Sequence, residues 1–464
     1  MSTDEIVAII MEDKTYNVSK SKLIENSDYF RALFSSGMRE SKENRVQLQG
    51  LSAHGLELVL RFINTSQVHV DNDNLEDLIQ AATFLQVTAI YKLLLSEICQ
   101  DNCLELYYLA DLYGLVDLRT ACLTFMACYY HVMLRREEFR CLPAAFGQQV
   151  KDLRMKGRAT LMAFGDFSGI SQDSLLSMLR YEEVAQRWLP FDCNFPADMV
   201  NVRGYGSAVL DNYFFIVGGY RITSQEISAA HCYNPSQNEW IQIASLNQKR
   251  SNFKLVPANG KLYAVGGHSL NSVECYSPEM DSWNFVAPLP DPLVEFSACE
   301  CKGMIYVMGG YTSRDRNMRI LCYCPTSDSW FSFQACSFHV RKQQMLSVED
   351  TIYLVGGYTH KIEPNKKTRQ SEDMLTVQSY NISTREWLCL KAINSKSGLN
   401  LTCTLHNDGI YIMSRDIRLP SSFEHIIFLK YNIFCDVWEG IRKVPPFGRN
   451  MLLCSLYLPN VIEL

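Results

Sequence analysis

The chain has 464 residues, of which 47% are hydrophobic and 20% are charged, and its formal net charge is −6. This length and composition predict a globular protein of two or three domains. The acidic balance argues against a nucleic-acid-binding surface, which needs a concentrated basic patch. The first ten residues, MSTDEIVAII, carry acids where a signal peptide needs bases, and no apolar run approaches the roughly 18 residues of a membrane span. We therefore expect an intracellular protein without membrane segments, with mostly reduced cysteines.

Residues from about 20 to 150 follow helical spacing. In DNLEDLIQAATFLQV the apolar residues Leu75, Leu78, Ile79 and Ala82 recur at i, i+3, i+4 and i+7, which is typical of one helix face. The next stretch, CLELYYLADLYGLVDLRTACLTFMACYY, predicts a helical hairpin that turns at Gly114, with Asp117 as the N-cap of its second helix. The pattern is lost between residues 141 and 158, where we expect a domain boundary.

A different pattern, of short apolar runs and turns, begins after that boundary. Each of the six tryptophans follows a tyrosine by seven residues: Tyr181/Trp188, Tyr233/Trp240, Tyr276/Trp283, Tyr323/Trp330, Tyr380/Trp387 and Tyr431/Trp438. Upstream of each pair lies an apolar run, as in YFFIVGG, and in four units it ends in a glycine pair: Gly218 and Gly219, Gly266 and Gly267, Gly309 and Gly310, Gly356 and Gly357. Such pairs permit positive φ and a close approach of neighbouring backbone.

The units recur every 43 to 57 residues, a spacing typical of kelch-type arrays in which each unit is one four-stranded blade. The paired rings would fill the wedge between blades, each hiding about 200 Å² while its O–H or N–H finds a partner. The first unit lacks its leading strand, whereas MLLCSLYLPN, at residues 451–460, has the pattern of a strand without a unit of its own. Residues 155–464 are therefore predicted to form a six-bladed β-propeller in which the C-terminal strand completes the first blade.

Three resemblances to known families cover most of the chain. SKLIENSDYFRALFSSGMRESKENRVQLQG resembles a BTB (POZ) domain, assigned to residues 1–98 with an α/β fold, and NCLELYYLADLYGLVDLRTACLTFM resembles the start of a BACK domain, assigned to residues 99–150. With the kelch repeats, this order is similar to that of kelch-like proteins. The resemblance implies a cytoplasmic, non-catalytic adaptor of a cullin-3 ubiquitin ligase, in which the BTB and first BACK helices bind the cullin and the propeller binds the substrate.

The same resemblance implies finer expectations. Several stretches of the repeats are similar to the family member whose substrate is the catalytic subunit of the microtubule-severing ATPase katanin, so a mitotic role at the cytoskeleton or spindle is expected. The BACK segment has about half of the family's length. The helix that family members exchange in BTB homodimers is expected to be absent, because the chain begins almost at the first strand, and self-association through the BTB domain is kept open.

Two sets of site residues follow from the resemblance. The family's cullin-contact motif, a hydrophobic residue followed two positions later by an acid, matches Met38, Arg39 and Glu40, which combine apolar burial with a charged anchor. On the propeller, basic residues in the loops could form a rim for an acidic or phosphorylated segment; scattered solvated charges are the alternative. They are Arg203, Arg221, Lys249, Arg250, Arg314, Arg316, Arg341, Lys342 and Arg449.

Other functions are weaker alternatives. The second hypothesis is a cytoskeletal scaffold that binds filaments through the propeller without recruiting a ligase. Catalysis is not expected, because no metal-ligand, Walker or nucleophile-elbow spacing occurs. The pairs Cys299/Cys301 and Cys322/Cys324 each supply two sulfurs where a structural zinc needs four ligands. We therefore expect neither a cofactor nor a metal.

Overall fold

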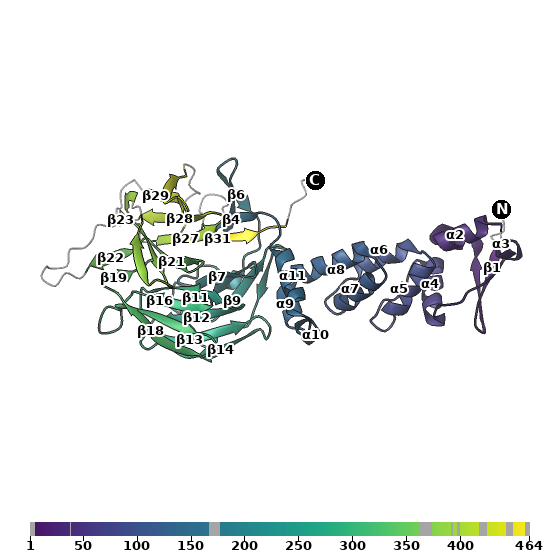
Figure 1. Ribbon diagram of the computed structural model, residues 1–464, viewed down its shortest axis with the longest axis horizontal. Coiled ribbons are helices and arrows are strands. Elements are labelled where there is room, and N and C mark those ends of the chain that lie inside the picture. Colours follow the sequence, from purple (N-terminus) through teal and green to yellow (C-terminus); the bar gives the residue numbers. More distant parts are fainter. Residues whose placement is uncertain are drawn as a thin grey trace. The chain divides into compact units, whose positions relative to one another are not determined.

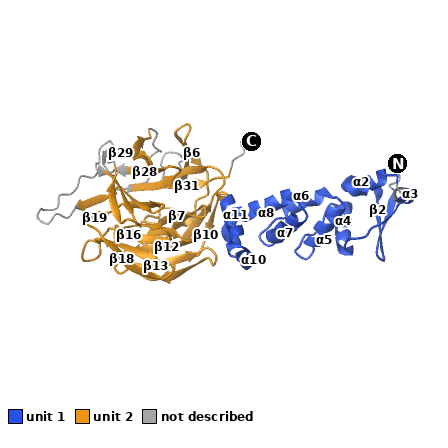
Figure 2. Cartoon of the chain, viewed as in Figure 1, with its two compact units in different colours: residues 1–153 blue, residues 154–464 orange. Residues whose placement is uncertain are grey.

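The computed structural model describes residues 5–37, 39–166, 177–361, 374–390, 393–396, 400–416, 425–441 and 449–459. The chain divides into two compact units, Met1–Leu153 and Arg154–Leu464 (Figure 2). Each unit is described by itself.

The first unit begins with a three-stranded sheet of order β2-β1-β3, in which β1 pairs antiparallel with β2 and parallel with β3. Its strands are β1 (Ile6–Met11), β2 (Lys14–Ser19) and β3 (Arg45–Gln47). Six helices accompany the sheet: α1 (Lys20–Asn26), α2 (Asp28–Ser35), α3 (Arg39–Glu43), α4 (Ala53–Thr65), α5 (Leu75–Phe84) and α6 (Thr88–Ser96). The apolar face expected in α5 is buried at Leu75, Leu78, Ile79 and Ala82. Side-chain caps start three other helices: Ser19, Ser27 and Ser52 each accept a hydrogen bond from the first turn of α1, α2 and α4.

Five further helices complete this unit: α7 (Cys103–Leu112), α8 (Val116–Cys128), α9 (Tyr130–Leu134), α10 (Glu137–Arg140) and α11 (Ala144–Arg154). The predicted hairpin is present as α7 and α8, with Gly114 at φ +68° between them. The N-cap of α8 is Leu115, so the prediction of Asp117 at that position is wrong; Asp117 lies in the first turn, where its charge favours the helix dipole. Helix α11 lies in the stretch where the apolar pattern of the sequence is lost. The division between the two units, after Leu153, falls within the predicted boundary at residues 141–158.

The second unit contains six four-stranded antiparallel sheets, the blades, and two short two-stranded sheets among its described residues. Its strands are labelled in Figure 1. Blade 1 contains β4 (Ala159–Asp166), β5 (Ser177–Glu182), β6 (Arg187–Phe191) and β31 (Arg449–Tyr457). A short 3-10 helix, Ala197–Met199, leads to blade 2, which contains β7 (Gly206–Leu210), β8 (Tyr213–Val217), β9 (Ala230–Asn234) and β10 (Glu239–Gln242). Blade 3 contains β11 (Lys254–Ala258), β12 (Lys261–Gly267), β13 (Leu270–Ser277) and β14 (Ser282–Val286).

The other three blades repeat this plan. Blade 4 contains β15 (Ser297–Cys301), β16 (Met304–Met308), β17 (Arg319–Cys324) and β18 (Ser329–Ala335). Blade 5 contains β20 (Gln344–Val348), β21 (Thr351–Val355), β24 (Val377–Asn381) and β25 (Glu386–Cys389). Blade 6 contains β27 (Asn400–His406), β28 (Gly409–Asp416), β29 (His425–Asn432) and β30 (Val437–Gly440).

The first strands of the blades contact one another in a closed circle, β31 to β7, β11, β15, β20, β27 and back to β31. This arrangement is a six-bladed propeller. The predicted closure is confirmed: β31, from the C-terminal end of the chain, pairs with β4 of blade 1 from Arg449 to Tyr457 (Figure 1). Asn212 of blade 2 fixes the end of this strand, because its side-chain amide makes two hydrogen bonds of 2.8 Å with the backbone of Tyr457.

The tyrosine–tryptophan spacing is the register of the last two strands in each blade. In all six blades the tyrosine and the tryptophan are direct cross-strand partners, and their ring centroids lie 4.7 to 5.4 Å apart. The turn residue five positions after each tyrosine has positive φ. In four blades it also accepts the tyrosine hydroxyl's hydrogen bond: Asn238, Asp281, Asp328 and Asp436.

The tryptophans fill the space between blades, but less completely than the sequence predicted. All six tyrosines of the pairs are buried, whereas among the tryptophans only Trp283 is buried. The expected burial is therefore incomplete for five of them, which are half-buried because the outermost strand of a blade leaves one edge of the ring in solvent: Trp188, Trp240, Trp330, Trp387 and Trp438.

Each half-buried indole still packs against a core that two neighbouring blades share. Trp188 lies 5.4 Å from the ring of Phe428 in blade 6, and Trp240 lies 6.1 Å from that of Phe164 in blade 1. Trp387 contacts Phe338, in the segment between blades 4 and 5, at 4.9 Å. Trp438 packs on the core formed by blades 5 and 6, as Trp330 does on that of blades 3 and 4. The predicted place of these rings, in the wedge between blades, is confirmed.

The expectation that every indole N–H finds a partner is wrong in blades 1 and 2. The N–H of Trp188 is buried without a hydrogen-bond partner among the described residues. That of Trp240 has only the thiol of Cys193 beside it, which is a weak acceptor. In blades 3 and 4 the acceptor is a backbone carbonyl of the segment that follows the preceding blade.

In blades 3 and 4 the turn and the indole together join neighbouring blades. Asp281 of blade 3 accepts a hydrogen bond from the backbone N–H of Ala244, which follows blade 2, and Trp283 donates its indole N–H to the carbonyl of the same Ala244. Blade 4 repeats the arrangement around Ala287, with Asp328 and Trp330. Here the repeated residues satisfy buried polar groups as well as filling the space between blades.

All eight glycines of the four pairs have positive φ. A Cβ at Gly218 would lie 2.7 Å from the carbonyl oxygen of Arg250, and one at Gly357 would lie 2.6 Å from that of Arg341. The predicted close approach of backbone is thus present, because the loop entering a blade passes directly over a glycine pair.

Two short two-stranded sheets accompany blade 5, where the sequence predicted loops. One pairs β19 (Phe338–Arg341) with β22 (Tyr358–Lys361), and the other pairs β23 (Met374–Leu375) with β26 (Ile393–Lys396). These segments extend outside the four-stranded repeat, so the repeat pattern did not reveal them. Residues 362–373, which follow β22, lie outside the described residues.

Candidate functional site

One face of the propeller gathers two sets of loops, those that enter a blade and those that follow a glycine pair. The backbone N–H of Arg203 donates to the carbonyl of Tyr220 at 2.9 Å, and the N–H of Val294 donates to that of Tyr311 at 3.0 Å. In blade 5 the same contact is the β19–β22 pair, which joins Arg341 to Tyr358. The loops that enter a blade and those that follow a glycine pair therefore lie side by side, and we call their common face the loop face.

A hollow of about 570 Å³ opens on the loop face and is lined by every blade, so it lies at the propeller axis. We call it the axial hollow; one lining residue from each blade is Leu452, Tyr205, Lys254, Phe296, Gln344 and Leu401. Lys254 is half-buried there at the start of β11. Burial lowers the pKa of Lys254, while the nearby thiol of Cys403 from blade 6 acts in the opposite direction. Burial also raises the pKa of that thiol, to about 12.

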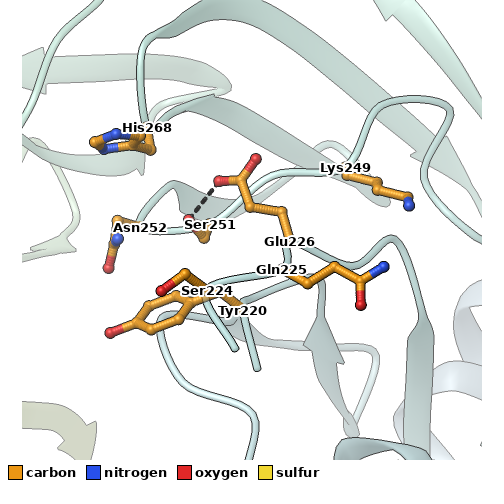
Figure 3. A pocket seen from close by; sticks show the side chains of 8 residues that line it. All are labelled: Tyr220, Ser224, Gln225, Glu226, Lys249, Ser251, Asn252 and His268. Carbon is orange, nitrogen blue, oxygen red and sulfur yellow. Dashed lines mark hydrogen bonds between the residues drawn. The ribbon is translucent and has the colours of Figure 1, made fainter. Parts of the chain in front are cut away.

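A second hollow, of about 600 Å³, lies between the loops of blades 2 and 3, and we call it the side pocket (Figure 3). Ser251 and Glu226 both line this pocket, and the Ser251 hydroxyl donates a 2.6 Å hydrogen bond to Oε1 of Glu226. Tyr220 and His268 border the same space, and the side chain of Lys249 extends away from the Glu226 carboxylate (Figure 3). A smaller hollow of about 360 Å³ lies beside Arg221 and Asp198.

The nine basic residues predicted for the loop face do not form one rim. Arg250 was expected to face a substrate, and that placement is wrong: its side chain is fully buried against Glu274 in blade 3. The side chains of Arg341 and Lys342 lie 3.2 and 3.0 Å from Glu295, which neutralises part of their charge. The others differ in exposure: Arg203, Arg221, Lys249 and Arg314 are exposed, Arg316 is half-buried, and the side chain of Arg449 lies outside the described residues.

The cullin-contact motif lies in the first unit. Met38 lies outside the described residues, as does the side chain of Glu40, although Glu40 belongs to α3. Arg39 is exposed and its guanidinium lies 2.7 Å from Glu43 one turn later. The role of this motif stays a prediction.

Sequence reasoning missed Glu226, Lys254 and Glu295, which place charges in or beside the two hollows. Only Lys254 had a local signal, because it begins an otherwise apolar strand, FKLVPA. The two acids lie in loops without a pattern of their own.

No group of three or more potential metal ligands occurs among the described residues. All seventeen cysteines are free thiols. In the part of the chain that the structure describes, no helix is long and apolar enough to cross a membrane.

Comparison with known proteins identifies both modules. A model of the BTB/POZ domain matches residues 7–102, and a model of the kelch motif matches residues 202–247, 249–290 and 292–333. Kelch-like protein 42 of Mus musculus is 59% identical, and that of Homo sapiens 58% identical, with all of both chains covered in each alignment. The chain belongs to the kelch-like family. A more distant member, kelch-like protein 9 of Mus musculus, is 25% identical over 55% of this chain and 57% of its own length.

The kelch-like matches coincide with the blades as folded. The three matched kelch motifs span blades 2, 3 and 4, which lie in the most regular part of the repeat. Blades 1, 5 and 6 have the same strand order without a motif match. The kelch motif model therefore identifies three of the six blades, and the strand order of the structure identifies the other three.

Proposed function

We propose that this protein is the substrate-recognition adaptor of a cullin-3 RING ubiquitin ligase. The BTB unit and the helices that follow it would bind the cullin, and the loop face of the propeller would bind the substrate. In this role the chain positions a substrate for a transfer reaction that another subunit catalyses, and needs neither a metal nor a cofactor of its own.

The observation that carries the proposal is the combination in one chain of a BTB domain and a closed propeller, with full-length similarity to kelch-like protein 42. Loops held on a rigid scaffold are a common place for binding residues. The axial hollow and the side pocket supply concave surface on that scaffold, as a recognised segment requires.

The test is co-precipitation of the cullin-3 N-terminal region with the full chain. We expect binding by the wild type and its loss with Met38→Asp, because a charge replaces the apolar residue of the proposed contact. Met280→Asp is the matched control, since Met280 is 68% exposed on the propeller. Circular dichroism must show equal folding of both variants. Absence of cullin-3 binding by the wild type would contradict the adaptor role and favour the filament-binding scaffold.

The finer parts of the proposal come from resemblance to kelch-like protein 42. They are the katanin catalytic subunit as substrate, a role in mitotic microtubule regulation, and a location in the cytoplasm and at the spindle. The test is the ubiquitylation of that subunit in dividing cells that express the wild type or Met38→Asp. Equal ubiquitylation of the katanin subunit in cells that express the wild type and in cells that express Met38→Asp would contradict katanin as the substrate.

A further inference from the structure

We infer that the loop face selects a protein segment of mixed charge, which places a basic side chain in the side pocket at Glu226 and an acidic group in the axial hollow at Lys254. This inference rests on the proposed substrate-recognition function and specifies the chemistry of the segment recognised. It replaces the expectation of a purely acidic partner, which assumed a continuous basic rim.

The side pocket offers an uncompensated carboxylate. Glu226 lines the pocket, its Oε1 accepts the Ser251 hydroxyl, and the described residues make no hydrogen bond to its other oxygen (Figure 3). Arg250 is close enough for Glu226 to influence its pKa, but its guanidinium already pairs with Glu274 at 2.6 Å. Among the described residues no cation forms an ion pair with Glu226. A lysine or arginine of a bound segment could therefore supply one.

Two ring side chains in the side pocket bear on its preference for a basic side chain. Tyr220 and His268 line the pocket together with Glu226 (Figure 3). The face of a tyrosine ring such as Tyr220 attracts cations, most strongly where water is partly excluded. The pocket thus combines a carboxylate with ring surface, a pairing that suits a long basic side chain better than an acidic one.

The axial hollow has the opposite character. Its acid, Glu295, is already engaged by Lys342 at 3.0 Å and Arg341 at 3.2 Å. Lys254 lines the same hollow and, within the described part of the chain, no carboxylate pairs with it. The ammonium group is costly to hold in this half-buried position, as the lowered pKa indicates. An entering carboxylate would relieve that cost by forming a charge-assisted hydrogen bond.

The two hollows are adjacent. Asn252 and His268 line both of them, so one extended segment can reach from one to the other. Opposite charges at two neighbouring positions also define the direction in which a segment binds, because reversing it would place each charge against a like charge.

Selection of a random peptide library displayed on phage, with the immobilised full-length protein as bait, tests this inference. The wild type should enrich peptides that carry one base and one acid at a constant spacing. Glu226→Gln should lose the preference for the base only, and Lys254→Met the preference for the acid only. Peptides chosen by the wild type should bind each variant about tenfold more weakly or worse, as expected for the loss of one charge-assisted contact. Lys254→Glu should select a second base in place of the acid.

Matched controls remove one charge outside both hollows: Lys302→Met, on an exposed turn of blade 4, and Glu279→Gln, on an exposed turn of blade 3. Both should select the wild-type peptides, and every variant should keep the wild-type unfolding midpoint. Enrichment of uncharged or purely acidic peptides, or no enrichment at all, would overturn the inference. Cullin-3 co-precipitation with the same variants distinguishes failure of this inference from failure of the adaptor role. If the protein binds cullin-3 but selects peptides of another chemistry, only the mixed-charge segment is rejected. If the wild type does not bind cullin-3, the adaptor role is rejected.

Discussion

Arg250 and Glu274 form a fully buried ion pair inside blade 3, with Nη2 of the arginine 2.6 Å from Oε1 of the glutamate. The guanidinium also donates to the carbonyls of Ala264, Gly266 and Ser272. Glu274 accepts the backbone N–H groups of Asn247 and Gln248. The pair therefore holds the loop that enters blade 3 against the strands of the same blade.

Removing the arginine should destabilise the propeller strongly. Arg250→Ala leaves the Glu274 carboxylate buried without its cation, which costs about 3–5 kcal/mol. We expect the free energy of propeller unfolding, measured by urea denaturation, to fall by that amount. Lys249→Ala, one residue earlier and exposed, should change it by less than about 0.5 kcal/mol. Equal stability of the two variants would contradict the structural role of Arg250.

The glycine pairs can be tested with two glycines of nearly equal backbone conformation. Gly357 has φ +72° and Gly260 has φ +74°, but a Cβ would lie 2.6 Å from the Arg341 carbonyl oxygen at Gly357 and would meet nothing within 4 Å at Gly260. Gly260→Ala should cost only the backbone strain, about 1–2 kcal/mol. Gly357→Ala should cost about 1–3 kcal/mol more, because the backbone must move. The comparison is made by thermal unfolding, and similar losses would argue against close packing at the glycine pair.

Closure of the ring depends on β31. Deleting residues 449–464 removes the strand that pairs with β4 and exposes the apolar edge of blade 1. We expect loss of cooperative unfolding and rapid proteolysis of the propeller, whereas deletion of residues 460–464 alone should preserve both. Asn212→Ala, which removes the two hydrogen bonds to Tyr457, should cost about 1–2 kcal/mol. A stable propeller without β31 would refute the closure.

Stability should also fall at acidic pH. Burial is the main reason why the pKa of His339 lies below its ordinary value of 6.5. The Gly310 carbonyl, 2.8 Å from Nε2, places the proton of the neutral ring on that nitrogen and offsets part of the lowering. Because the unfolded chain then binds more protons, the contribution of His339 is complete above about pH 6.5 and is lost as the pH falls toward the lowered folded-state pKa. Urea denaturation at pH 7.5 and 5.5 should show this loss. His339→Gln should reduce the difference, and an unchanged difference would count against His339.

The repeat allowed most of the propeller to be predicted from the sequence. Tyr276 and Trp283 are seven residues apart because they are cross-strand partners around one turn, and the spacing encodes this local register directly. Two segments outside the repeat, α11 and the β19–β22 pair, have no comparable spacing in the sequence. Helix α11 has few apolar residues, and β19 pairs with β22 outside the repeat, so neither shows a periodic pattern.

The spacing also could not predict how the indoles are paired. Trp188 and Trp283 occupy equivalent positions in their blades, yet Trp283 is buried with its N–H bound to Ala244, while Trp188 is half-buried and its N–H lacks a partner among the described residues. The acceptor comes from the loop between blades, and these loops differ in sequence from one blade to the next.

Short-range spacing, glycine conformation and apolar runs were sufficient to predict the number of blades, their strand order and the closure by the C-terminal strand. They did not predict which charges face the loop surface. Arg250 is buried against Glu274, 24 residues away, and Arg341 pairs with Glu295, 46 residues away. Glu226 and Lys254 line the two hollows and have no ion-pair partner among the described residues. The charge that a loop presents depends on partners from other loops and strands, which come together only when the chain folds, and no local pattern encodes them.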